Sequence, residues 1–169
     1  GKEVAARFIH GQSDRASAPF VVVNCAAIEP DQMERVLFGQ ESSYKGITEG
    51  LLEQANQGVV YFDEVADMPL VTQSKILRVL VDQSFQRVGG TENVNVDLRV
   101  ISSTSRDLNQ EIAEKSFREE LFHRLNVVPI SVPSLEERRE DIPMLCETLL
   151  EQIAEQGGEA SRTLAADGL

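Results

Sequence analysis

Three short apolar runs constrain the fold of this chain more than any other feature. Residues 20–23, 59–62 and 99–103 are rich in β-branched side chains and are bounded by polar or turn-forming residues, which is typical of buried strands. Elsewhere, apolar residues recur at helical spacing, which predicts helices over 2–10, 33–38, 50–55, 69–81, 109–115, 117–125 and 142–154. Strands that alternate with helices predict an α/β fold with a parallel sheet flanked by helices.

The segments between these elements carry weaker patterns. A glycine pair at 89–90 separates two short apolar segments, 85–88 and 94–96, and this predicts a β-hairpin. Residues 39–50 are polar and contain three glycines, which favours a loop or a disrupted hairpin. The apolar residues of 127–132 predict a further strand.

Charge and cysteine content exclude several classes of protein. The chain has 16 Lys and Arg against 28 Asp and Glu, a formal net charge of −12, whereas a nucleic-acid-binding domain normally presents a basic patch. No apolar run approaches the ~20 residues that span a bilayer. The spacing of Cys25 and Cys146 suggests neither a metal site nor a disulfide framework. We therefore expect a soluble, cytoplasmic chain with buried thiols and no membrane partner.

Lys2, Asp63 and Glu64 form the clearest candidate site. Lys2 begins a predicted helix, and Gly1-Lys2 has the form of the end of a phosphate-binding loop. Asp63 and Glu64 follow a buried strand, at the sheet edge where open α/β folds bind ligands. One carboxylate could hold Mg²⁺ on a nucleotide while its neighbour polarises the attacking water. The alternative interpretation is a solvated loop after a core strand.

Residues 1 to about 145 resemble a known family, the AAA+ domains of bacterial enhancer-binding proteins of the NtrC family. The matching segments are, in order, GKEVAARFIH, VVVNCAAI, LFGQE, GVVYFDEVADMP, QSKILRVL, RVGG, DLRVISST and FREELFHRLNVVPISVPSLEERREDIP. These proteins are ATPases that activate transcription by sigma-54 RNA polymerase. The segments YFDEVADMP and RVLVDQSFQRVGG are most similar to the NtrX branch, which consists of response regulators of nitrogen metabolism.

The resemblance implies a nucleotide-binding role for the candidate site. Gly1 and Lys2 match the end of the Walker A loop, in which the lysine contacts the β- and γ-phosphates of ATP. Asp63 matches the magnesium ligand of the Walker B motif, and Glu64 matches the residue that activates water. ATP and Mg²⁺ are therefore the implied cofactors.

Four further residues complete the implied set. Asn24 matches an Asn that restrains the catalytic Glu until subunits engage. Thr104 falls in the segment that senses the γ-phosphate, although Ser105 stands where the family often has Asn. Arg118 and Arg124 match an arginine pair presented to the nucleotide of a neighbouring subunit, where a guanidinium accelerates phosphoryl transfer. The residue types alone leave open a strand-end cap, a core hydroxyl and exposed ion pairs, respectively.

The resemblance also implies a domain organisation. Residues 1–140 match the AAA+ α/β core, incomplete at its N-terminal central strand, and residues 141–169 match the start of a helical lid. The chain begins without a methionine, and we expect it to be a piece of a longer protein. The implied partners are further copies of the chain in a hexameric ring, sigma-54 RNA polymerase, and DNA through a separate domain.

One family motif is missing. The family contacts sigma-54 through a GAFTGA loop, whereas the residues between Glu41 and Leu52 read SSYKGITEGL, and members of the NtrX branch can lack the motif too. Two functions therefore stay open. The first is an ATP-hydrolysing, ring-forming transcription regulator that remodels a partner. The second is a non-hydrolysing ATP-binding module that serves oligomerisation of a response regulator acting without sigma-54. FREELFHRL and EERREDIP disfavour other AAA+ classes, such as chaperones or DNA-processing motors.

Overall fold

The computed structural model describes residues 1–42, 44 and 46–157. They belong to two compact units, of which the first spans Gly1–Pro129 and the second begins at Ile130. Among the described residues, no helix combines the length and the apolar character needed to cross a membrane. The assignment of 1–140 and 141–169 to a core and a lid stays a prediction.

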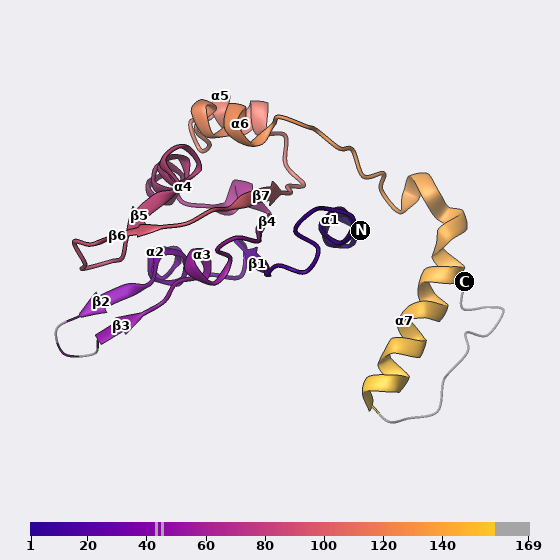
Figure 1. The fold of residues 1–169 in the computed structure, drawn as a ribbon. Helices are drawn as coiled ribbons and strands as arrows, with labels where there is room; N and C mark the ends of the chain where they lie inside the picture. The colour runs from indigo at the N-terminus through magenta and orange to yellow at the C-terminus, as the bar shows by residue number, and fades with distance from the viewer. Residues whose placement is uncertain (43, 45, 158–169) are drawn as a thin grey trace. The chain divides into compact units, whose positions relative to one another are not determined.

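A parallel sheet of three strands lies at the centre of the first unit (Figure 1). The strands β1 (Phe20–Asn24), β4 (Val59–Asp63) and β7 (Arg99–Ser102) pair in the order β1-β4-β7. The register places Asn24 opposite Asp63, so β1 and β4 end side by side. The parallel α/β sheet predicted from the sequence is thus confirmed.

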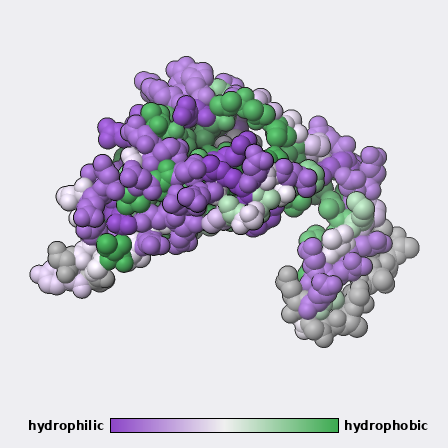
Figure 2. Space-filling model, viewed as in Figure 1, coloured by the Kyte–Doolittle hydropathy of each residue, from purple (hydrophilic) through white to green (hydrophobic). Residues whose placement is uncertain are grey.

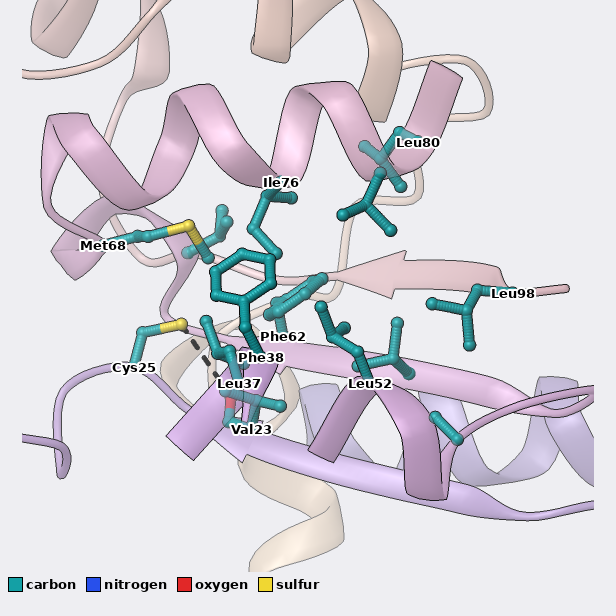
Figure 3. Close-up of a cluster of buried hydrophobic side chains, with 14 of the residues drawn as sticks. Val23, Cys25, Leu37, Phe38, Leu52, Phe62, Met68, Ile76, Leu80 and Leu98 are labelled. Atoms are coloured by element: carbon teal, nitrogen blue, oxygen red, sulfur yellow. Dashed lines mark hydrogen bonds between the residues drawn. The ribbon is translucent and has the colours of Figure 1, made fainter. Parts of the chain in front are cut away.

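The side chains of β4 alternate between two covered faces of the sheet. Val60 and Phe62 belong to the main hydrophobic core, in which Figure 3 shows Phe62. The helices that contribute buried side chains to this core are α2 (Met33–Phe38), α3 (Leu51–Gln54), α4 (Leu70–Asp82) and α6 (Glu119–Leu125). Tyr61 lies on the opposite face, where its ring stacks on Phe20 and α1 (Lys2–Gly11) contacts β4. Polar residues cover most of the surface that Figure 2 shows.

Short elements connect these layers. The 3-10 helix η1 (Val65–Asp67) follows β4, and α5 (Leu108–Ala113) follows β7. In the second unit, the 3-10 helix η2 (Glu136–Asp141) leads into α7 (Ile142–Gly157). The helices predicted from apolar spacing are therefore present, with ends that differ from the predicted ones by a few residues.

Two β-hairpins are joined to each other outside the main sheet. The segment 39–50 forms a hairpin of β2 (Gln40–Ser42) and β3 (Gly46–Thr48), and the predicted hairpin is formed by β5 (Ser84–Gln86) and β6 (Asn93–Asn95). The amide of Glu41 donates to the carbonyl of Val88 at 2.9 Å, and the amide of Val88 donates to Gly39 at 3.1 Å. The two hairpins consequently share backbone hydrogen bonds.

An ion cluster reinforces this junction. The guanidinium of Arg87 donates to both carboxylate oxygens of Glu53 in α3, at 2.9 and 2.5 Å, and lies 3.9 Å from Glu41. The side chains of Arg87 and Glu53 are only 13% and 9% exposed. Hydrogen bonding to Glu53 raises the pKa of Arg87 above its ordinary value. The cluster ties the two hairpins to a helix of the core.

The strand predicted over 127–132 is wrong. No residue of this segment pairs with a strand among the described residues. Val127, Val128 and Ile130 are 74%, 76% and 62% exposed. A β-branched apolar run forms a strand only where a neighbouring strand can take its backbone hydrogen bonds, and none lies beside this segment in the described part of the chain.

Substitution of Gly50 by Ala should destabilise the first unit by about 1–3 kcal/mol. A Cβ at Gly50 would overlap the backbone nitrogen of Gly39 and the carbonyl oxygen of Leu37, neither of which can rotate away. Urea denaturation followed by circular dichroism measures the change. The control is Gly11→Ala, because a Cβ there meets nothing within 4 Å. Equal stabilities for the two variants would contradict the close approach at Gly50.

Removal of the Arg87 guanidinium should destabilise the protein by roughly 3 kcal/mol. Arg87→Met leaves the carboxylates of Glu53 and Glu41 without their cation in a largely buried place. The matched control is Arg139→Met, because the Arg139–Glu136 pair is 73% and 80% exposed and such pairs contribute at most ~1 kcal/mol. A loss below 1 kcal/mol for Arg87→Met, measured by the same denaturation, would show that the cluster is dispensable.

Candidate active site

Lys2 and Glu64 meet where the start of α1 faces the end of β4. Gly1 is the N-cap of α1 and Lys2 is its first residue, while Glu64 follows Asp63 directly. The ammonium Nζ of Lys2 lies 2.5 Å from Oε1 of Glu64, and both side chains are partly exposed. The structure therefore brings together Gly1, Lys2 and the two carboxylates that the sequence singled out.

Glu64 is held by a second residue and by a strained backbone. Its other carboxylate oxygen, Oε2, accepts hydrogen bonds from the amide and hydroxyl of Ser105, at 2.8 and 2.9 Å. Its φ and ψ are 50° and 57°, the left-handed region that non-glycine residues rarely adopt, and such residues cluster at functional sites. Burial by itself raises the pKa of Glu64, but the bonds from Lys2 and Ser105 outweigh burial and lower it.

Asp63 is fixed by two hydroxyl groups. The phenol of Tyr61 lies 2.9 Å from Oδ1 of Asp63, and the hydroxyl of Ser103 donates to the same oxygen at 2.6 Å. The two hydroxyls lie 2.8 Å from each other. Burial raises the pKa of Tyr61 to about 12, and its hydrogen bond to Asp63 adds to the rise. Neither hydroxyl residue was singled out in the sequence.

The donor set at this edge suits a magnesium ion that is carried by phosphates. Mg²⁺ binds through one or two carboxylates and keeps its remaining positions for water and phosphate oxygens. Asp63 offers Oδ2, which forms no hydrogen bond within the described part of the chain. No cluster of three or more His, Cys, Asp or Glu side chains that could enclose a metal occurs among residues 1–42, 44 and 46–157. A site built from protein ligands alone does not fit here.

Asn24 and Thr104 bond to their own loops. Oδ1 of Asn24 accepts the amide of Ala26 at 3.1 Å, which is the strand-end cap of the alternative interpretation. Oγ1 of Thr104 accepts the amide of Arg106 at 3.0 Å, and this side chain is only half-buried. Asn24 ends the strand beside Asp63 but forms no hydrogen bond with Glu64 in the described structure. The family roles of both residues stay predictions.

Arg118 and Arg124 lie at α6 and bond to α4. Nε of Arg118 donates to the carbonyl of Leu70 at 3.1 Å, and a terminal nitrogen of Arg124 donates to the carbonyl of Leu80 at 2.8 Å. Neither guanidinium contacts Lys2 or the carboxylates within the described part of the chain. Arg118 and Arg124 thus make no contact with the Lys2, Asp63 and Glu64 site among the described residues, and their role stays a prediction.

The sequence contained a signal for the residues that were missed. Ser103 ends the third predicted run, 99–103, and Ser105 lies two residues further on, while the register pairs Phe62 with Ser102. The next residue, Ser103, therefore stands beside Asp63. In neighbouring parallel strands, the residues at the carboxyl ends lie at the same edge of the sheet. The position of Ser103 beside Asp63 could therefore have been predicted. The reach of Ser105 to Glu64 depends on the turn after β7, which has no such regularity.

The fold and the site define an open parallel α/β domain with a lysine-led helix facing two carboxylates. Residues 1–131 match the model of the sigma-54 interaction domain, and the chain belongs to this family, the AAA+ domain of NtrC-type regulators. It is 51% identical over 170 residues to the nitrogen assimilation regulatory protein NtrX of Azorhizobium caulinodans, a match that covers 100% of this chain and 37% of that protein. The predicted membership and the predicted similarity to NtrX are confirmed.

Two further relatives agree with this result. The chain is 46% identical over 168 residues to the transcriptional regulator NtrC of Escherichia coli K12, covering 97% of this chain and 36% of the relative. The crystal structure of NtrX from Brucella abortus superposes with a TM-score of 0.92 at 58% identity, covering 99% of this chain and 38% of that one. Structures of the same Brucella protein in complex with ADP and with ATP are also similar. The chain spans little more than a third of these relatives.

Cys25 should resist alkylation in the folded protein. It is buried, whereas Cys146 is half-buried. Burial raises the pKa of Cys25 to about 12, with the charges of Asp67, Asp63 and Glu64 adding to the rise, so the reactive thiolate is scarce at about pH 8. We expect iodoacetamide to modify Cys25 roughly a thousandfold more slowly in the native than in the urea-unfolded protein. Equal rates in peptide mass mapping would contradict its burial.

Proposed function

We propose that this chain is the ATP-binding and ATP-hydrolysing AAA+ module of a DNA-binding response regulator of the NtrX type. The observation that supports this most is the Lys2–Glu64 pair at the start of α1, next to Asp63 at the end of β4. A helix N-terminus with a lysine attracts phosphate groups. Carboxylates beside it are suited to a metal ion and to water activation.

The ATP assignment draws on the relatives as well. Brucella NtrX, which shares 57% sequence identity with this chain in the superposed structure, has been solved with ATP. In our proposal, Lys2 binds the β- and γ-phosphates and Gly1 lies at the end of the loop around them. Asp63 holds Mg²⁺, which would neutralise phosphate charge when bound. Thr104 lies at the same edge, after β7, and contacts the γ-phosphate.

Glu64 is the proposed base that orients and deprotonates water. The bonds from Lys2 and Ser105 lower its pKa, so it is a carboxylate at neutral pH. The same bonds engage both of its oxygens, so in our proposal Glu64 is not yet free to orient the attacking water. Binding of phosphates by Lys2 would release Oε1. In our proposal, Asn24, which ends the neighbouring strand, then restrains Glu64 until the subunits are engaged.

Arg118 and Arg124 are proposed to act on the nucleotide of a neighbouring copy in a hexameric ring. The support is that both guanidiniums bond to backbone carbonyls of α4 instead of to their own site. Residues 1–140 would form the core of each subunit and residues 141–169 the start of its lid. Sigma-54 RNA polymerase, and DNA through a separate domain, are the proposed partners in the cytoplasm.

A second function is favoured by two observations. Both oxygens of Glu64 are already bonded within the chain, and the segment between Glu41 and Leu52 has no GAFTGA motif. That segment forms the β2–β3 hairpin, in which Ser43 and Lys45 lie outside the described residues. A module of this kind would bind ATP, assemble, and act on promoters without hydrolysis or sigma-54 activation.

ATP hydrolysis measured against protein concentration tests the proposal and separates the two functions. In the intact protein, turnover per subunit should rise with concentration, because the arginines come from a neighbouring copy. Glu64→Gln should lower turnover about 10²–10⁴-fold, and Arg118→Ala or Arg124→Ala about 10³-fold or more.

Arg139→Ala is the matched control, because this arginine lies in an exposed ion pair and should leave turnover unchanged. Tight ATP binding with background turnover at every concentration would favour the second function. Absence of ATP binding would contradict both functions.

A further inference from the structure

We infer that Tyr61 and Ser103 are positioning residues for the metal ligand Asp63. They hold one oxygen of its carboxylate and leave Oδ2 as the single oxygen that binds a divalent cation. The inference rests on the proposed function, since it concerns the metal that accompanies the nucleotide. It deepens that function by assigning the metal affinity of the site to two hydroxyl groups behind the carboxylate.

Packing fixes the Tyr61 ring independently of its hydrogen bond to Asp63. Its residue is 0% exposed, in the middle of β4, the central strand of the sheet. Its ring lies 6.0 Å from that of Phe20 at an interplanar angle of 21°, so it is stacked on the neighbouring strand. The phenol oxygen of this buried, stacked ring lies 2.9 Å from Oδ1 of Asp63.

Ser103 is fixed by its backbone. Its amide donates to the carbonyl of Phe62 at 2.8 Å, and its carbonyl accepts the amide of Val65 at 2.9 Å. Both backbone polar groups of Ser103 are thus hydrogen-bonded. From this fixed backbone, the hydroxyl donates to Oδ1 of Asp63 at 2.6 Å. The amide of Cys25 donates to the carbonyl of Asp63 at 2.9 Å, so the backbone of the metal ligand is fixed as well.

The three oxygen atoms form a closed triangle that contains two hydroxyl protons. Ser103 donates its proton to Oδ1 of Asp63. The phenol proton of Tyr61 goes either to the same oxygen or to the hydroxyl of Ser103. In both arrangements Oδ1 is an engaged acceptor, and the carboxylate cannot rotate without breaking a charge-assisted hydrogen bond.

The consequence is a preorganised ligand with one free oxygen. Mg²⁺ needs near-octahedral geometry and binds through one or two carboxylates, with water and phosphate oxygens at its other positions, and an Asp63 that presents only Oδ2 suits a site of this kind. Hydrogen-bonding partners of metal ligands typically change metal affinity or activity 10–100-fold when removed. A phenylalanine at position 61 would fill the same space without burying a phenol, so packing alone does not account for the hydroxyl.

The test is cation binding by the intact protein in the presence of ATP. Mn²⁺ titrations followed by electron paramagnetic resonance give the cation affinity, and a fluorescent ATP analogue in EDTA gives the metal-free nucleotide affinity. Tyr61→Phe should weaken cation binding about tenfold and leave metal-free nucleotide binding unchanged. A merely structural role for the phenol would change both affinities or neither.

Matched variants sharpen the test. Tyr44→Phe removes the only other phenol in the chain, which is 100% exposed, and should match the wild type. Ser103→Ala should weaken cation binding as Tyr61→Phe does, whereas Ser103→Thr retains the hydroxyl and should restore it. Because the two hydroxyls act on one oxygen, the double variant Tyr61→Phe/Ser103→Ala should lose affinity by a factor different from the product of the single losses.

The outcomes distinguish this inference from the proposed function. A wild-type protein that binds no ATP, or binds it equally with and without the cation, would contradict the proposed function. A wild-type protein that binds both, together with unchanged cation affinity in Tyr61→Phe and Ser103→Ala, would overturn only the role of the hydroxyls. Equal losses of cation and metal-free ATP affinity in these variants would overturn it too.

Discussion

The parallel pairing of β1, β4 and β7 is the constraint on which the rest of the structure depends. Because the three strands run in one direction and Asn24 stands opposite Asp63, their carboxyl ends share one edge. That edge collects Asp63, Glu64 and the serines after β7, and the start of α1 adds Lys2. Strand ends in open α/β sheets gather polar groups in this way, and here these groups bond directly to one another.

The adjacent carboxylates of Asp63 and Glu64 have different surroundings, and this suggests different chemical roles. Asp63 accepts hydrogen bonds at Oδ1 from the uncharged hydroxyls of Tyr61 and Ser103. Its carboxylate therefore remains available to a cation through Oδ2. Both carboxylate oxygens of Glu64 are bonded, one to the ammonium of Lys2 and the other to Ser105. Its backbone has a left-handed conformation. In our account the first carboxylate is ready for its ligand, whereas the second is occupied until phosphates bind Lys2.

The sequence predicted the parts of the fold that depend on local pattern. The three apolar runs predicted the strands of the parallel sheet, and the spacing of apolar residues predicted the helices. Both predictions work because burial on one or two faces of an element gives a periodic pattern of apolar residues. The predicted strand over 127–132 failed because a strand needs a neighbour, which local pattern does not specify. In the site, Lys2, Asp63 and Glu64 were found, but Tyr61, Ser103 and Ser105 depend on register and on a turn. Resemblance to a family suggested Arg118 and Arg124, whose bonds to α4 no local pattern predicts.

A structure of the intact protein with Mg²⁺ and a non-hydrolysable ATP analogue would test the central claim most directly. The account predicts the phosphates at the start of α1, with the Lys2 ammonium moved from Glu64 to the phosphates. It also predicts Oδ2 of Asp63 facing the metal while Oδ1 keeps its bonds to Tyr61 and Ser103. A nucleotide bound at this edge with the Lys2–Glu64 pair intact, or a nucleotide bound elsewhere, would contradict it.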